Sequence, residues 1–169
     1  MSKTLFLVRH AKTQQESIDN RDFSRELADR GIHDASLVGS YCKEHGHKVD
    51  MIISSPAARA LATAELMALQ SDYSLDNIHS NEELYMASVR TSLKVVNQLK
   101  DIWDKVMIVG HNPTMTYMGE YMSDAEIGNM ATGSVMIINF DADSWQEISE
   151  NSGILASYIS PRMVKDGLV

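Results

Sequence analysis

Residues 4–10 read TLFLVRH, an apolar run that ends in Arg9 and His10. A short apolar run of this kind is typical of a strand that is buried on both faces of a sheet. Two later segments are similar, at 49–54 (VDMIIS) and at 106–109 (VMIV), and the second of them runs into Gly110. We therefore predict strands at 4–9, 49–54 and 106–109 in a largely parallel central sheet.

Helical signals lie between and after these strands. Ser55-Pro56 is typical of a helix cap followed by a first-turn proline, and Asn112-Pro113 predicts the start of a later helix. Ser88 predicts the cap of a further helix, and residues 28–45 carry apolar side chains at helical spacing. The predicted buried face of the 28–45 helix consists of Ile32, Ala35, Val38 and Cys42.

The remaining segments complete the predicted architecture. A charged and amide-rich loop is expected from Lys12 to about Arg25, and the last part of the chain predicts strands at 134–140, around Trp145 and at 154–159. The alternation of strands and helices favours a three-layer α/β/α sandwich with a mainly parallel central sheet. With 169 residues, no internal repeat and no linker rich in proline or glycine, we expect one domain that spans residues 1–169.

Composition excludes several classes of protein. A net charge of −8 is unfavourable for binding nucleic acid or an anionic membrane surface. No apolar run reaches the roughly 18 residues of a membrane span, and the N-terminal apolar run lacks the cleavage site of a signal peptide. The single Cys42 rules out an internal disulfide and fits a reducing compartment. We expect a monomeric cytoplasmic protein.

Three of the predicted strands end in polar residues. The first ends in Arg9-His10, the second is followed by Ser55 with Arg59 shortly after it, and the third is followed by His111. Ligands of open parallel sheets bind beyond the carboxyl ends of the strands. The sequence therefore predicts one pocket that contains two histidines and two arginines.

This mixture of side chains suits phosphoryl transfer. Arginine matches the oxygens of a phosphoryl group in a bidentate way, and catalysis of this reaction consists mainly of positioning and charge stabilisation. A neutral imidazole can act as a nucleophile, while a second imidazole can donate a hydrogen bond to a phosphoryl oxygen. Helices that begin near Pro56 and Pro113 would point their N-terminal amides at the anion. We see no cluster of carboxylates with metal-ligand spacing, so we expect neither a metal nor another cofactor.

The motifs at these strand ends resemble those of a known family. Residues 7–11 (LVRHA), 55–64 (SPAARALATA) and 109–113 (VGHNP) are similar to the three motifs of the histidine phosphatase, or phosphoglycerate-mutase-like, superfamily. Residues 25–31 (RELADRG), 132–134 (TGS), Trp145 and 160–162 (SPR) resemble its small phosphohistidine phosphatase (SixA-like) branch. Together these stretches extend over nearly the whole chain.

The resemblance implies a role for each matching residue. His10 would be the catalytic nucleophile, and His111 would be catalytic by stabilising the phosphoryl oxygens. Arg9, Arg59 and Arg25 would bind phosphate. The substrate it implies is a phosphohistidine on a protein. Two alternatives stay open: a phosphomonoesterase that acts on a small phosphorylated metabolite, and a phosphohistidine-binding module without turnover.

One position departs from the superfamily pattern. Esterases of the superfamily carry an acidic residue in a Leu-x-Glu pattern, whereas this chain reads Leu84-Tyr85-Met86. Glu82 and Glu83 are near in sequence, on the other side of Leu84, and either is a candidate general acid. The departure favours a substrate whose leaving group needs little protonation.

Two other phosphatase chemistries do not fit the sequence. A cysteine nucleophile needs an arginine six positions later, and that position after Cys42 holds Lys48. Asp141 and Asp143 follow an apolar run as in aspartate-nucleophile enzymes, but too little chain follows them for the remaining motifs of that fold. We interpret residues 141–144 as a turn.

Overall fold

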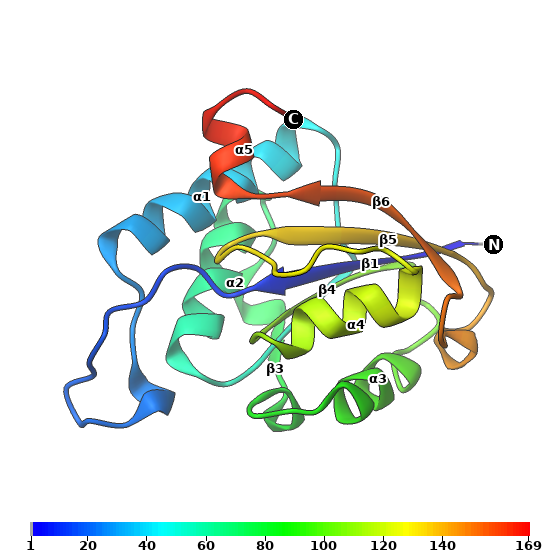
Figure 1. The fold of residues 1–169 in the computed structure, drawn as a ribbon, viewed down its shortest axis with the longest axis horizontal. Coiled ribbons are helices and arrows are strands. Elements are labelled where there is room, and N and C mark those ends of the chain that lie inside the picture. Colours follow the sequence, from blue (N-terminus) through cyan, green and yellow to red (C-terminus); the bar gives the residue numbers. More distant parts are fainter. Residues whose placement is uncertain (1) are drawn as a thin grey trace.

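The computed structural model describes residues 2–169, and its centre is a six-stranded sheet with the order β3-β2-β4-β1-β5-β6 (Figure 1). Strands β3, β2, β4 and β1 are parallel to one another, whereas β5 and β6 are antiparallel to their neighbours. The prediction of a mainly parallel sheet is confirmed. The strands are β1 (Ser2–Arg9), β2 (Met51–Ser54), β3 (Ile78–Ser80), β4 (Lys105–Gly110), β5 (Val135–Asp141) and β6 (Gly153–Ile159).

Helices cover both faces of this sheet, which makes the predicted three layers (Figure 1). One face packs against α3 (Val89–Asn97) and α4 (Thr114–Ser123). The other packs against α1 (Asp29–Glu44), α2 (Ala58–Gln70) and the short α5 (Pro161–Lys165). The side chains of β1 alternate between the two cores, because successive residues of a strand point to opposite faces. Leu5 and Leu7 join the α3–α4 side, and Phe6 and Val8 join the α1–α2 side.

The structure also contains four short 3-10 helices within residues 2–169, none of which was predicted. They are η1 (Asp22–Ser24), η2 (Leu75–Asn77), η3 (Glu82–Leu84) and η4 (Trp145–Glu147). The prediction of a strand around Trp145 is therefore wrong. Ser144 and Glu147 form a capping box that starts η4, and the buried Trp145 indole donates a hydrogen bond to the Trp103 carbonyl at 2.7 Å.

Two details of the predicted helices also differ. Ile32 is 45% exposed and does not belong to the buried face of α1, because Gly31 occupies that face in the first turn. Helix α2 begins at Ala58, after Ser55-Pro56, and its N-cap is Ala57. The other three predicted members of the α1 face, Ala35, Val38 and Cys42, are buried as expected.

The loop between β1 and α1 is anchored at both ends. Ala28 N–H donates to the Lys12 carbonyl at 2.9 Å, and Thr13 pairs with Leu27 as an isolated antiparallel bridge. Helix α1 passes close to the backbone of Lys12 at Gly31, where a Cβ atom would lie 2.1 Å from the Lys12 carbonyl oxygen. Only glycine permits such a close approach of two backbones. Within residues 2–169, no helix has both the length and the apolar character that crossing a membrane requires.

We expect Gly31→Ala to destabilise the protein by about 3 kcal/mol or more, because a methyl group there collides with backbone that cannot easily move. Gly119→Ala is the matched control. Its Cβ would lie 2.4 Å from the Sδ and Cε atoms of Met136, which are the movable end of a side chain and not backbone, and alanine is the better helix former. Urea denaturation of both variants measures the difference, and equal stability of the two would contradict this account of the close approach.

Candidate active site

The parallel register brings three polar strand ends to one edge of the sheet. Arg9 pairs with Gly110 and Ser54 pairs with Val109, so the residues that follow these strands start at the same level. His10 N–H donates to the Gly110 carbonyl at 3.0 Å. As a result the rings of His10 and His111 lie with their centroids 5.3 Å apart. The predicted pairing of the two histidines is present in the structure.

The His10 ring is held in one orientation. Its Nδ1 atom lies 2.8 Å from the Ala11 carbonyl oxygen, which can only accept, so Nδ1 carries the proton and Nε2 carries the lone pair. The ring is 9% exposed, and this burial is the main reason why its pKa falls to about 4, with further lowering by the charges of Arg59 and Arg9. At neutral pH the ring is therefore an uncharged imidazole with an available Nε2.

His111 faces the same space with a different hydrogen-bonding pattern. Its Nε2 atom lies 2.7 Å from the Ser55 hydroxyl, and its buried Nδ1 has no hydrogen-bond partner within residues 2–169. When Ser55 donates to Nε2, the ring proton resides on Nδ1 and is free to be donated to a ligand. Burial and then the charge of Arg59 lower the pKa of His111 to about 3.

Arg9 and Arg59 supply positive charge beside the two rings. The Arg9 Nη1 group donates to the Met130 carbonyl at 2.6 Å, and Arg59, the second residue of α2, is 6% exposed. The Nε atoms of both arginines are buried without a partner in the described part of the chain. Together with His111 Nδ1 they make three buried polar atoms that lack partners. Native proteins rarely leave such groups unsatisfied, and guanidinium and imidazole N–H groups are suited to binding an anion.

Two of the motif stretches of the sequence, around Gly133 and Thr63, support this arrangement through hydrogen bonds. Gly133, which has a positive φ of 74°, donates its N–H to the carbonyls of Arg9 and His10, each at 3.0 Å. The Thr63 hydroxyl donates to the Arg59 carbonyl at 2.8 Å and accepts from Ala11 N–H at 3.0 Å. These bonds tie the start of α2 and the chain before β5 to the end of β1.

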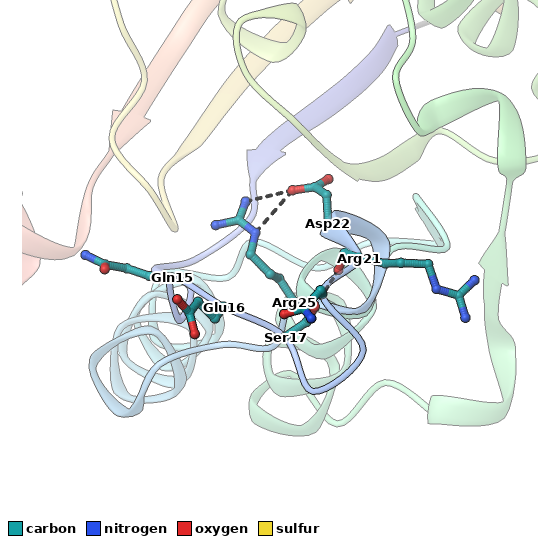
Figure 2. A pocket seen from close by; sticks show the side chains of 7 residues that line it. Gln15, Glu16, Ser17, Arg21, Asp22 and Arg25 are labelled. Carbon is teal, nitrogen blue, oxygen red and sulfur yellow. Dashed lines mark hydrogen bonds and ion pairs between the residues drawn. The ribbon is translucent and has the colours of Figure 1, made fainter.

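Asp22 lies among the arginines, although no role was predicted for it. Its Oδ2 atom accepts from Arg59 Nη2 and from the Tyr85 hydroxyl, each at 2.9 Å, while its Oδ1 atom lies 3.1 Å from Arg25 Nη2. Figure 2 shows Arg25 extending from the loop toward Asp22. Burial alone would raise the pKa of Asp22, but the hydrogen bonds from Tyr85 and Arg59 outweigh that effect and lower it.

The structure therefore brings four of the five predicted residues together directly and the fifth through Asp22. His10, His111, Arg9 and Arg59 share the edge of the sheet, and Arg25 reaches them by way of the Asp22 carboxylate. Sequence reasoning missed three participants: Asp22, Ser55 as the partner of His111, and Tyr85, whose ring centroid lies 5.6 Å from that of His111. The only signal for Asp22 is its position three residues before Arg25.

The side chains of the two candidate acids make no direct contact with this cluster among the described residues. Glu82 and Glu83 are exposed in η3, and neither has a hydrogen bond or ion pair with the site histidines or arginines within residues 2–169. A pocket of about 300 Å³ adjoins the cluster on the loop side (Figure 2). Asp22 and Arg25 line it, and the two histidines do not. Among the described residues, no group of three or more histidine, cysteine, aspartate or glutamate side chains could hold a metal ion.

One family model matches half of the chain, and the sequence also has similar relatives. The sequence model of the histidine phosphatase superfamily (branch 1) matches residues 5–89. An uncharacterized protein of Mycobacterium leprae is 25% identical over 150 residues, which cover 83% of this chain and 89% of that protein.

Two solved structures share the fold. One is the protein histidine phosphatase SixA complexed with tungstate, with a TM-score of 0.80, 18% identity, and coverage of 94% of this chain and 97% of that one. The other is a mycobacterial glucosyl-3-phosphoglycerate phosphatase, with a TM-score of 0.69, 13% identity, and coverage of 92% and 98%.

The two lowered histidine pKa values predict how stability depends on pH. The unfolded chain takes up protons at these rings near pH 6.5, whereas the folded protein does so only near pH 4 and pH 3. The free energy of unfolding should therefore fall as the pH drops from 6.5 to 4, and His10→Gln should reduce this slope by up to about 1.4 kcal/mol per pH unit. Denaturation at several pH values measures the slope, and NMR titration of the rings checks it directly. A midpoint near 6.5 for either ring would contradict the prediction.

Proposed function

The chain belongs to the histidine phosphatase superfamily and is a phosphatase, and on this basis we propose that it hydrolyses phosphohistidine on a protein through a covalent phosphohistidine at His10. One observation carries the proposal. The neutral His10 ring has its Nε2 lone pair available at a site where Arg9, Arg59 and His111 each have a buried polar atom without a partner in the described chain. A nucleophile surrounded by unpartnered donors fits a reacting phosphoryl group.

The proposed reaction has two steps. In the first, His10 Nε2 attacks phosphorus, the bond from phosphorus to the leaving nitrogen breaks, and its electron pair goes to the leaving imidazole. Arg9, Arg59 and Arg25 bind the phosphoryl oxygens, and His111 donates from Nδ1 to one of them. In the second step, water attacks the phosphorus on His10, the bond from phosphorus to Nε2 breaks and its electron pair returns to Nε2. Inorganic phosphate leaves with the protons of the water, and the free ring is restored.

The side chains near the position of the superfamily's acid, within residues 2–169, support the choice of substrate. Glu82 and Glu83 are exposed, Met86 is 85% exposed, and the Tyr85 hydroxyl has a raised pKa because of burial and its hydrogen bond to Asp22. An alkyl ester leaves as an alkoxide that needs a proton, whereas phosphohistidine can leave as a neutral imidazole. The site is therefore better suited to phosphohistidine than to an alkyl phosphate of a small metabolite.

The short connection between α2 and β4 also supports a protein substrate. Only η2, β3, η3 and α3 lie between Gln70 and Lys105, which leaves little chain for a lid over the site. Enzymes that act on small metabolites commonly close over their substrates to exclude water. We further propose that residues 1–169 form one catalytic domain, which acts as a cytoplasmic monomer and needs no metal.

We predict that His10→Ala lowers kcat by at least about a thousandfold, because the nucleophile is lost. Wild-type protein quenched during turnover of a radiolabelled substrate should carry an acid-labile, alkali-stable label on His10. His33→Ala is the matched control, since His33 is an exposed histidine on α1, and it should keep normal turnover. Near-normal turnover by His10→Ala would overturn the mechanism, and binding of phosphohistidine without release of phosphate by the wild type would favour a binding module.

We also predict that kcat/KM is higher for a phosphohistidine protein than for any alkyl phosphate ester, with activated aryl phosphates in between. The reason is that only the alkyl esters require protonation of a poor leaving group. Steady-state assays on a phosphohistidine protein, an aryl phosphate and a panel of sugar phosphates and phosphoglycerates give the ranking. A better rate with one of the metabolites would favour the phosphomonoesterase, with Glu82 or Glu83 as its acid.

A further inference from the structure

The Asp22 carboxylate interacts with donor side chains from three separate segments of the fold. Arg59 comes from α2, Arg25 from the end of the η1 loop, and Tyr85 from the segment after η3. Arg59 also donates from Nη1 to the Asp22 backbone carbonyl at 2.7 Å. Asp22 thus accepts hydrogen bonds from both terminal nitrogens of Arg59.

These donors are the ones that a phosphoryl group would use. Guanidinium groups bind carboxylates and phosphates with the same bidentate geometry, so the two anions are interchangeable partners for Arg59 and Arg25. The lowered pKa of Asp22 shows that its carboxylate is ionised at neutral pH and can act as such an anion. Asp22 and a phosphoryl group therefore cannot both hold these donors in full.

We propose that Asp22 is a specificity-determining residue, an internal carboxylate that competes with the phosphoryl group for Arg59, Arg25 and Tyr85 and is displaced when that group binds. The inference rests on the proposed phosphate site, and it concerns which anions that site accepts. Displacement is feasible because the Asp22 side chain is 53% exposed and can move into water, where a carboxylate is well solvated.

The exchange favours ligands that make more interactions with these donors than a single carboxylate can make. A phosphoryl dianion brings three terminal oxygens and greater charge, and it can also satisfy the three unpartnered atoms: Arg9 Nε, Arg59 Nε and His111 Nδ1. A singly charged carboxylate would only replace one ion pair by another. Competition from Asp22 also weakens the hold on inorganic phosphate, so the product leaves more readily.

A second consequence concerns the leaving group. After displacement the Asp22 charge remains tethered beside the site, because the loop is anchored at Lys12 and Ala28. That charge repels a leaving group that carries its own carboxylate or second phosphate and tolerates a neutral or protonated imidazole. Asp22 thereby favours phosphohistidine over acidic phosphometabolites.

Equilibrium binding of inorganic phosphate to the full-length protein tests the competition. We expect Asp22→Asn to bind phosphate at least about tenfold more tightly than the wild type in calorimetric titration, because an uncharged amide competes poorly for arginine. Glu16→Gln is the matched control. Glu16 is an exposed carboxylate that lines the loop pocket together with Asp22, so this variant removes the same charge from the same loop without touching Arg59 (Figure 2).

The controls separate direct competition from simple repulsion. The gain from Asp22→Asn should persist at 0.5 M salt, an ionic strength at which repulsion between exposed charges is largely screened to about 4 Å. Equal or weaker phosphate binding by Asp22→Asn, or a gain no greater than that of Glu16→Gln, would overturn the proposal. Absence of phosphate binding by both Asp22→Asn and the wild type would instead contradict the phosphate site, and with it the proposed function.

A crystal structure of the wild-type protein with bound tungstate gives an answer that does not depend on the variant's folding. We expect the bond between Asp22 Oδ2 and Arg59 Nη2 to be broken, with Arg59 bound to the oxyanion. An intact Asp22–Arg59 pair beside a bound oxyanion would overturn the proposal. Asp22→Asn should also raise kcat/KM for 4-carboxyphenyl phosphate relative to phenyl phosphate, and an unchanged ratio would contradict the role in leaving-group selection.

Discussion

The parallel pairing of β1 with β4 is the constraint on which the rest of the site depends. Its register sets Arg9 beside Gly110, and the His10 N–H continues the ladder by one more hydrogen bond to the Gly110 carbonyl. A shift of one residue would turn every side chain of β1 to the opposite face and move its apolar residues between the two cores. The separate packing of Leu5 and Phe6 on opposite faces therefore fixes the position of His10 as well as the stability of the sheet.

Much of the fold and most of the candidate site could be predicted because both rest on local patterns. Buried strands appear as apolar runs, and the polar residues directly after them must lie at the edge of the sheet. His10 and His111 follow such runs without an intervening loop. Their proximity could therefore be predicted without knowledge of the tertiary contacts. Arg59 was predictable for a similar reason, since it lies in the first turn of the helix after β2.

Most of the features that sequence reasoning missed depend on distant contacts, and one local signal, the capping box at Ser144 and Glu147, was overlooked. Tryptophan is common in strands, but the capping box of Ser144 and Glu147 and the hydrogen bond from Trp145 to Trp103 favour a 3-10 helix instead. Ser55 looks like a helix cap, yet its hydroxyl binds His111, which lies 56 residues away in sequence. Asp22 is separated from Arg59 by 37 residues and from Tyr85 by 63, and no periodicity connects positions so far apart.

The anchoring of the β1–α1 loop has a consequence for how such a protein can diversify. The Thr13–Leu27 bridge and the bond from Ala28 to Lys12 close the loop at its base, where Gly31 holds α1 against it. The loop beyond this base can be lengthened, shortened or replaced as a unit while His10 stays in place on its strand. Insertions at the tip offer evolution, or a designed library, a way to change which groups meet the arginines without rebuilding the scaffold. The nucleophile and the tip of the loop are thus close in the chain but structurally separated by two residue pairs, Thr13–Leu27 and Lys12–Ala28.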